Sequence, residues 1–470
     1  MSTVSARALA AFLVGWRDAG VAYAALADRI RLLILDGRVG SGTRLPAERE
    51  LAAQLEVSRT TVTAAYAELR ALGYLSSVRG SGSVAQLPHR APVSTEPQSG
   101  FFDFSKATMP AIPEVLPASR LAAEQLSAYL GESGFDPMGL LVLREAIADR
   151  YTARGLPTGP DQVMVTIGAQ HAISLIARTV MARGDRALIE NPTYPHAMDA
   201  LKTAGARLVP VSVTSEDGWD ELALEQAIQR TSPSLGYVMP DHHNPTGRSM
   251  DAALRERLLG LAARHGTTIV ADETMAELGL DGQPPTLPLA AHGSAILVGS
   301  VGKSVWGGLR IGWIRADRTI IQRLARARSS GDLGSPMLEQ LIVANLLRDF
   351  EPILEARRAY LRAGRDRLAA LLAERLPEWH VPHTSGGLTS WVGLGEPVSS
   401  QLAIAARNEG LVIAAGPRFG IDGAFERFIR IPFSLSAEET EGGVDALARA
   451  WAAVGHHSYQ SNADELAGVV

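Results

Sequence analysis

The sequence predicts an α/β protein in two parts: a small helical module with a β hairpin, then a large domain around a mainly parallel sheet. Apolar residues at helical spacing, followed by a short hairpin pattern, occupy residues 20–86. Residues 87–100 have no apolar period and contain three prolines, which is typical of a linker. From about residue 140, short apolar strands alternate with longer helical patterns, which favours α/β layering.

The remaining boundaries follow from where these patterns begin and stop. The large domain is expected to span residues 101–455 and to finish in a smaller α+β part. Residues 456–470 are expected to be a disordered tail.

Composition excludes several classes of protein. The 470 residues include no cysteine, which excludes disulfides, thiolate metal sites and a cysteine nucleophile. No apolar run of about 20 residues and no signal-peptide pattern occur, so we expect a cytoplasmic protein without a membrane partner. The net charge is −5, yet residues 1–85 hold ten arginines against seven acidic residues. This asymmetry predicts a basic module on an acidic body.

The N-terminal module reads as three helices and two strands. The first helix is expected to stop at Asp36-Gly37, and the third to begin at the N-cap Ser58 and to end at Gly73. A second helix opens after Pro46, and two short strands flank residues 78–82. The pattern predicts a helix-turn-helix with a glycine-tipped wing.

The third helix presents polar groups at its start. Ser58, Arg59, Thr60 and Thr61 place a guanidinium and three hydroxyls where recognition helices contact base edges and phosphates. Taken alone, these residues are equally consistent with ordinary capping beside a solvated arginine.

Four motifs in order decide between these interpretations. Residues 42–52, 57–62, 73–75 and 79–82 resemble the GntR-type winged helix-turn-helix along its whole length. The resemblance implies that the module binds a double-stranded DNA operator. It assigns DNA contacts to Arg44, Arg49, Ser58, Arg59, Thr60, Thr61, Arg79, Gly80 and Gly82.

Lysine is rare in this chain, which has Lys106, Lys202 and Lys303 among 45 basic residues. Lys303 follows an apolar strand and precedes Arg310 by seven positions. Because a lysine amine can hold an aldehyde cofactor as a Schiff base, Lys303 is the candidate catalytic residue. The rival interpretation, a nucleotide P-loop at Gly302-Lys303-Ser304, requires a glycine where Leu297 stands.

The predicted strands are 163–166, 187–190, 235–239, 267–272 and 295–300. Open α/β sheets bind ligands at the carboxyl ends of their strands. There the chain offers a helix start at Gly168-Ala169-Gln170 suited to phosphate, Tyr194 suited to stacking, Asn244 before a proline bond of cis character, and the carboxylate Asp272. Each has a purely structural alternative when taken alone. The adjacent His242 and His243 diverge, so no metal site is expected.

Taken together, these residues account for every polar edge of pyridoxal 5′-phosphate (PLP). Gly168, Ala169, Gln170, Ser300 and Arg310 suit the phosphate, Tyr194 the ring face, Asn244 the phenolic oxygen, Asp272 the pyridine nitrogen and Lys303 the aldehyde. The ordered set resembles the fold type I aminotransferases over residues 101–455. This resemblance assigns Arg430 to the carboxylate of an amino acid, although from the sequence alone Arg430 could equally lie on a surface strand.

Two positions depart from that family. A tyrosine usually stands two or three residues after the pyridine aspartate, and here Thr274 and Met275 occupy those places. A tyrosine often precedes Asp136-Pro137 by two residues, and this chain has Gly134. Cofactor binding is expected to survive these losses more readily than fast turnover.

A GntR-type module joined to an aminotransferase-like domain resembles the MocR/GabR regulators. The resemblance implies a PLP-dependent transcription regulator whose effector is an amine, an amino acid or PLP itself. It also implies a head-to-tail homodimer with each DNA module over the partner's large domain. The alternatives are an active aminotransferase localised by its DNA module and a scaffold that binds PLP and DNA without switching.

Overall fold

The structure is a computed structural model that describes residues 3–13, 16, 21–35, 38–40, 42–78, 82–86, 101–283, 286–421 and 423–454. Several predictions fall outside these residues: the helix stop at Asp36-Gly37, the linker 87–100, the tail 456–470, and the DNA contacts Arg79 and Gly80.

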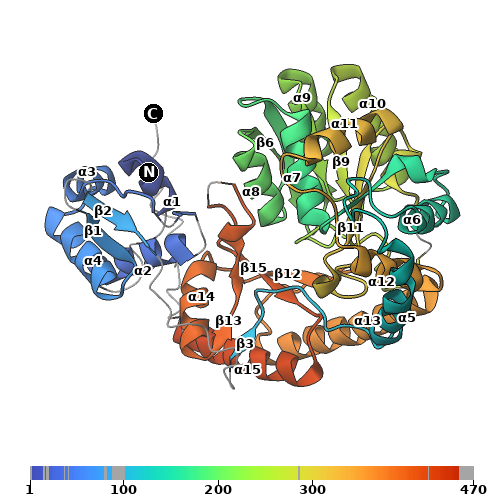
Figure 1. Ribbon diagram of the computed structural model, residues 1–470. Helices are drawn as coiled ribbons and strands as arrows, with labels where there is room; N and C mark the ends of the chain where they lie inside the picture. Colours follow the sequence, from blue (N-terminus) through green and yellow to red (C-terminus); the bar gives the residue numbers. More distant parts are fainter. Residues whose placement is uncertain are drawn as a thin grey trace.

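The N-terminal module (residues 6–85) forms a separate lobe beside the rest of the chain (Figure 1). It has its own apolar core, which includes Leu26, Leu51 and Leu69. Its elements are α1 (Ala6–Phe12), α2 (Ala22–Leu35), α3 (Glu48–Leu55), α4 (Arg59–Ala71), β1 (Leu75–Val78) and β2 (Gly82–Ala85). The predicted helices and hairpin are present, and α1 is an additional helix that the sequence pattern did not reveal.

The ends of α4 explain why this helix forms where it does. The Ser58 hydroxyl accepts a hydrogen bond from the Thr61 N–H at 3.1 Å, as expected of an N-cap. At the other end, Gly73 has a φ of 77°, a left-handed conformation that glycine adopts without steric cost.

The large domain is built on a sheet with the strand order β4-β11-β10-β9-β8-β5-β6-β7 among the described residues. Its strands are β4 (Val163–Thr166), β5 (Arg186–Asn191), β6 (Arg207–Thr214), β7 (Gly218–Trp219), β8 (Leu235–Val238), β9 (Thr268–Asp272), β10 (Ile296–Ser300) and β11 (Gly312–Arg315). The pairs from β10 through β9, β8 and β5 to β6 are parallel, while β11 runs antiparallel between β10 and β4. All five predicted strands are present, and β6, β7 and β11 were not predicted.

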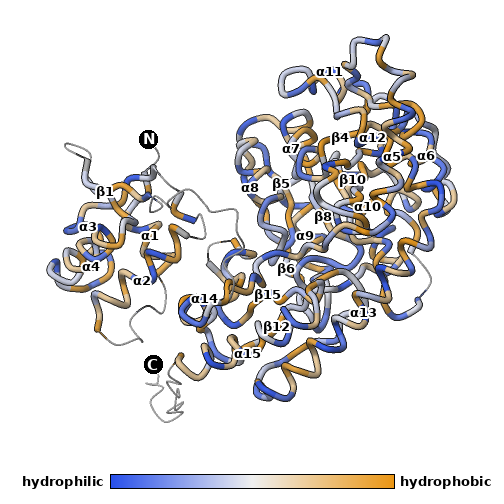
Figure 2. Tube along the Cα trace, turned by 60° about the horizontal axis from the view of Figure 1, so that its bottom comes forward, coloured by the Kyte–Doolittle hydropathy of each residue, from blue (hydrophilic) through white to orange (hydrophobic). Residues whose placement is uncertain are grey.

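Helices cover both faces of this sheet, and alternate strand residues enter two separate cores. Ile296 and Val298 of β10 pack with α7 (Ala169–Val180), α8 (Pro195–Thr203) and α11 (Arg318–Arg328). Leu297 packs on the opposite face with α6 (Leu141–Ala153), α9 (Glu221–Thr231) and α10 (Ala252–His265). Figure 2 shows hydrophobic trace concentrated in this central layer, as expected for strands buried on both faces.

The C-terminal small domain is α+β, as predicted. Its elements are α13 (Phe350–Arg375), β12 (Thr389–Gly393), α14 (Ser399–Asn408), β13 (Leu411–Val412), β14 (Ala414–Ala415), β15 (Phe428–Pro432) and α15 (Ala437–Ala453). β15 is the middle strand of the sheet β12-β15-β14. The short strand β3 (Phe102–Asp103) pairs with β13, and α5 (Val115–Gln125) packs on α12 (Met337–Leu347).

The N-terminal module lies beside α14 of the small domain (Figure 1). Arg29 of α2 forms an ion pair with Glu426. The same carboxylate accepts hydrogen bonds from the Ser399 hydroxyl at 3.0 Å and from the Ser400 N–H at 2.9 Å, at the start of α14. Among the described residues, no helix is both long enough and apolar enough to cross a membrane.

Candidate cofactor site and DNA-binding face

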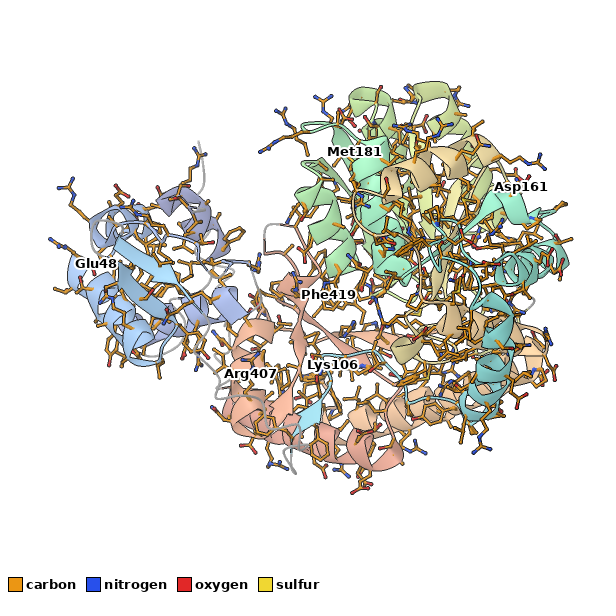
Figure 3. The ribbon with its side chains drawn as sticks, viewed as in Figure 1. Glu48, Lys106, Asp161, Met181, Arg407 and Phe419 are labelled. Carbon is orange, nitrogen blue, oxygen red and sulfur yellow. The ribbon has the colours of Figure 1, made fainter. Side chains whose placement is uncertain are left out.

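A cavity of about 330 Å³ opens at the carboxyl ends of the parallel strands, where the large sheet faces the small domain. Figure 3 labels Lys106 and Phe419 in this region. Every residue that the sequence proposed for cofactor or substrate lines this cavity: Gly168, Ala169, Gln170, Tyr194, Asn244, Asp272, Ser300, Lys303, Arg310 and Arg430. Residues spread over more than half of the chain therefore meet in one place.

Lys303 lies in the turn between β10 and β11. Its ammonium nitrogen donates a hydrogen bond to the carbonyl oxygen of Ala107 at 2.7 Å. Burial, together with the nearby charge of Arg430 and opposed by that of Asp272, lowers the pKa of Lys303 to about 8. A lysine with this pKa is partly neutral near physiological pH, which is the form that attacks an aldehyde.

Asp272 is buried at the end of β9, and both of its oxygens are held. The Tyr237 hydroxyl donates to Oδ2 at 2.7 Å, and the Thr274 hydroxyl donates to Oδ1 at 2.7 Å. No cationic side chain of the described residues pairs with Asp272. A protonated ring nitrogen would supply the positive partner that a buried carboxylate requires.

The start of α7 forms a cradle for an anion. Gly168 caps this helix with a φ of 79°, and an added Cβ there would lie 3.1 Å from a guanidinium nitrogen of Arg310. Only glycine therefore allows so close an approach between the helix start and the guanidinium. Helix-start N–H groups beside an arginine suit a phosphate.

The other two proposed phosphate residues have partners in the protein. The Ser300 hydroxyl donates to the carbonyl of Ile311 at 3.0 Å and accepts from the Gly302 N–H at 3.0 Å. The Gln170 amide nitrogen donates to the carbonyl of His196 at 2.8 Å. Ser300 therefore shapes the Lys303 turn in addition to lining the cavity.

Arg430 lies on the central strand β15 and is only 6% exposed, so it is not a surface arginine. It donates to the carbonyl of Ser105, and its guanidinium carbon lies 5.1 Å from the centre of the Phe419 ring. Burial lowers the pKa of Arg430 to about 10. Within the described chain, no carboxylate lies within ion-pair distance of it, so a ligand carboxylate could fill that role.

Tyr194 and Asn244 complete the wall of the cavity. Burial, followed by the charge of Asp272, raises the pKa of Tyr194 to about 12, so the phenol stays neutral. The Asn244-Pro245 bond is cis, as expected, and the buried Asn244 side-chain oxygen has no partner in the described part of the protein.

The two histidines beside Asn244 diverge. His242 lines the cavity, whereas His243 is buried against Glu190 at 3.2 Å and Thr246 at 2.9 Å.

Neither residue at the positions of the missing tyrosine after Asp272 carries a phenol. The Thr274 hydroxyl is turned toward Asp272, and Met275 contributes an apolar side chain to the cavity. The phenol of Tyr237 is close to Asp272, but Tyr237 lies within β8 and its hydroxyl donates to the carboxylate of Asp272. Sequence reasoning missed Tyr237, His242 and the lining segment Ser105–Thr108.

These observations satisfy the requirements of PLP. The cavity offers a partly neutral amine, an anion cradle and a buried carboxylate without a cationic partner. Each of these groups lies at the strand end that the sequence indicated.

A second hollow, of about 620 Å³, lies on the N-terminal module. It brings together Arg44, Arg49, Arg59 and Gly82, which the sequence assigned to DNA, and adds Arg70, which it did not. Ser58, Thr60 and Thr61 stand beside it, and the Ser58 hydroxyl lies 2.7 Å from that of Thr60. The result is a concave, arginine-rich face at the start of the recognition helix α4.

Two protein families match this chain. Residues 99–447 match "Aminotransferase class I and II", and residues 22–84 match "Bacterial regulatory proteins, gntR family". The chain thus belongs to the class of GntR-type regulators fused to a fold type I aminotransferase-like domain.

Individual relatives indicate the subfamily within this class. The chain is 32% identical over 402 residues to the probable rhizopine catabolism regulatory protein MocR of Rhizobium meliloti, covering 77% of this chain and 80% of that protein. It is 28% identical over 455 residues to the HTH-type transcriptional regulator YisV of Bacillus subtilis (strain 168), covering 88% and 93%. The chain belongs to the MocR/GabR-like subfamily, and its cofactor is PLP.

A solved structure shows the cofactor in a similar fold. LysN, an α-aminoadipate aminotransferase from Thermus thermophilus, was solved with N-(5′-phosphopyridoxyl)-L-leucine. It matches with a TM-score of 0.69 and 28% identity, covering 76% of this chain and 93% of LysN.

Proposed function

We propose that this DNA-binding regulator holds PLP on Lys303 and changes its DNA binding when an amine-bearing effector, or PLP itself, enters the cavity. The observation that carries the proposal is the convergence of Lys303, Asp272, Arg310 and Arg430 on one cavity, in a chain that also carries the GntR module.

The residues of the cavity have separate tasks. Bound PLP supplies an aldehyde that reacts with primary amines. Lys303 provides the attacking amine, and Asp272 holds a proton on the ring nitrogen because its buried charge needs a positive partner. Arg310, with the N–H groups of Ala169 and Gln170, binds the phosphate. Tyr194 stacks on the ring, and Asn244 contacts its phenolic oxygen.

Arg430 defines the class of effector. Its buried guanidinium lacks a carboxylate partner in the described protein, so an amine that also carries a carboxylate gains an ion pair there. Amino acids and ω-amino acids both meet this description.

The exposed arginines of the module bind DNA. Arg59 contacts a base edge, while Arg44 and Arg49 contact phosphates. The hydroxyls of Ser58, Thr60 and Thr61, the wing glycines Gly80 and Gly82, and Arg79 complete the contact set.

The active unit in this proposal is a head-to-tail homodimer, as the resemblance to the MocR/GabR regulators implies. A protein that binds promoter DNA in a bacterium acts in the cytoplasm, which is the proposed location.

A second function has one observation in its favour. LysN, which resembles the large domain, is an aminotransferase, so this chain could be an aminotransferase localised on DNA. Against it, Thr274 and Met275 place no phenol where that family has one. A positioned general acid or base raises the reaction rate roughly 10²- to 10⁴-fold. Because this phenol is missing, turnover should be slow.

The test follows ketoacid release and DNA affinity in the same samples. Footprinting on the region upstream of the protein's own coding sequence defines the probe. PLP, amino acids and ω-amines are then added singly. A spectral change coupled to altered DNA affinity, and absent from Lys303→Ala, supports the regulator. Multiple turnovers per second without any change in DNA affinity would establish the enzyme instead.

A further inference from the structure

A short segment that crosses the cavity uses its backbone carbonyls as acceptors for side chains from the cavity wall. This crossing segment, residues 103–110, follows directly from β3. The carbonyl of Ser105 accepts from Arg430, and that of Ala107 accepts from Lys303 at 2.7 Å. Further along, the carbonyl of Thr108 accepts from Ser434 at 3.1 Å.

Two of these donors are the groups that the proposed function requires for ligands. An ammonium group has three N–H donors. When the Lys303 amine condenses with an aldehyde carbon, a carbon–nitrogen double bond forms, one water leaves, and the nitrogen keeps at most one hydrogen. A neutral imine nitrogen would have no N–H for Ala107, and a protonated one would have a single N–H fixed in the plane of the double bond in place of three that rotate, so the present bond to Ala107 would be weakened or lost. A carboxylate bound to Arg430 likewise competes with the carbonyl of Ser105, because a charged acceptor binds a guanidinium more strongly.

The crossing segment is held firmly at its start. The Phe102 N–H donates to Gly410 at 2.9 Å and the Phe104 N–H to Val412 at 2.8 Å, which fixes β3 on β13. Residues 87–100 join this point to the N-terminal module. Any movement of the segment therefore occurs within a few residues of the linker to the DNA-binding face.

Asp103 holds the crossing segment in a turn through its side-chain contacts. One of its carboxylate oxygens accepts from the Ser105 N–H at 3.0 Å and from the Ser105 hydroxyl, and the other pairs with Lys106 at 2.7 Å. This tight turn directs the carbonyl of Ser105 toward Arg430.

We propose that the crossing segment accepts hydrogen bonds from Lys303 and Arg430 in place of their ligands. When cofactor and effector bind, the segment is released, and its release transmits the binding event to the linker. Asp103 is the positioning residue. The inference rests on the proposed function, because it takes Lys303 and Arg430 as the ligand-binding groups.

The first test measures amide hydrogen exchange over residues 105–109 in the full-length protein, with and without PLP. In the wild type, attachment of PLP should speed exchange at least tenfold. Cofactor-free Lys303→Ala should already exchange at that faster rate, since it lacks the same hydrogen bond. Lys202→Ala, in the last turn of α8 and outside the cavity lining, should behave like the wild type.

Two outcomes separate the claims. If cofactor-free Lys303→Ala exchanges as slowly as cofactor-free wild type, Lys303 does not hold the segment and the inference is overturned. If PLP produces no visible absorbance band in the wild type, the proposed function fails, whereas the comparison of the two cofactor-free proteins still decides the inference.

The second test concerns Asp103 and uses the footprinted DNA. Asp103→Ala should keep the PLP band, show fast exchange without PLP, and reduce the PLP-induced change in DNA affinity to less than twofold. Asp103→Asn should respond like the wild type, because its amide oxygen can still accept from Ser105. Lys202→Ala, outside both the crossing segment and the cavity lining, is the control. A full DNA response in Asp103→Ala would overturn the proposal.

Discussion

The two functional regions of this chain are built in opposite ways. The DNA-binding face takes its groups from fewer than 45 consecutive residues, and Arg44, Arg49 and Arg59 on it are exposed, while Arg70 is half-buried. The cofactor cavity takes its groups from Ser105 to Arg430, and its Asp272 and Arg430 are buried, whereas Lys303 is half-buried and Arg310 is exposed. Exposed charges contribute modestly and independently, whereas buried charges depend on one another. Substitutions should therefore have graded effects in the module and large, coupled effects in the cavity.

The sharpest test of this contrast is removal of the cavity amine. Lys303→Ala should abolish the visible band of covalently attached PLP, because Lys202 does not line the cavity and Lys106, which does, is exposed and paired with Asp103. DNA affinity of cofactor-free Lys303→Ala should shift toward that of the PLP-loaded wild type, because the substitution also removes the hydrogen bond that holds the crossing segment. Addition of PLP should then produce no further change. Absorbance spectroscopy checks the first result and gel-shift titration the second. Loss of the band in Lys202→Ala would contradict the assignment.

In the module the expected loss is partial. Arg59→Ala should weaken specific DNA binding by about 1–3 kcal/mol if Arg59 contacts a base bidentately. The PLP band should remain unchanged. Arg7→Ala, an exposed arginine on α1 away from the hollow, provides the control and should leave the affinity near that of the wild type. Equal operator binding by Arg59→Ala and wild type would remove Arg59 from the recognition surface.

A pH series probes the buried amine directly. Because burial lowers the pKa of Lys303 to about 8, the neutral fraction of the amine should rise about tenfold between pH 7 and pH 9 and then level off. The rate of PLP attachment, followed by stopped-flow absorbance, should rise over the same range. A lysine with its ordinary pKa of 10.5 would still be accelerating at pH 10, and that outcome would exclude the lowered pKa.

The prediction with the smallest expected effect tests whether the two regions unfold independently. Ser58→Ala removes the N-cap of α4, and Asp220→Ala removes the N-cap of α9 in the large domain. Each should destabilise its own region by about 1 kcal/mol. Native-state hydrogen exchange should report the loss in α4 for the first variant and in α9 for the second. Equal losses in both helices would show a single cooperative unit.

The same contrast explains what could be predicted from the sequence. The module is a run of local signals, such as the Ser58 cap and the Gly73 stop, so three of its helices and its hairpin were predicted, and α4 nearly to the residue. The helix α1 was missed. The buried parallel strands were predicted because each is a short apolar run ending in polar residues. β11 has no such run, and its place between β10 and β4 depends on pairing across the chain.

The missed site residues have a related cause. Tyr237 contacts Asp272 only through the register of β8 on β9, which no local pattern reveals. The crossing segment stands at the start of the large domain's sequence, far from the strands that carry Asp272 and Lys303. Its one available signal was Lys106, one of three lysines retained in an arginine-rich chain.

The hairpin that joins β10 to β11 carries both Lys303 and Arg310 on one short stretch of backbone. Ser300 ties the base of this hairpin to Ile311 through its hydroxyl, so the spacing between the two cationic groups is set by the number of intervening residues. An insertion or deletion between them would displace the amine relative to the guanidinium, and no rearrangement of a neighbouring helix could restore both. Residues 87–100 carry none of the proposed cofactor-site residues. Across homologues, length variation should therefore accumulate between the two domains and be absent between positions 303 and 310.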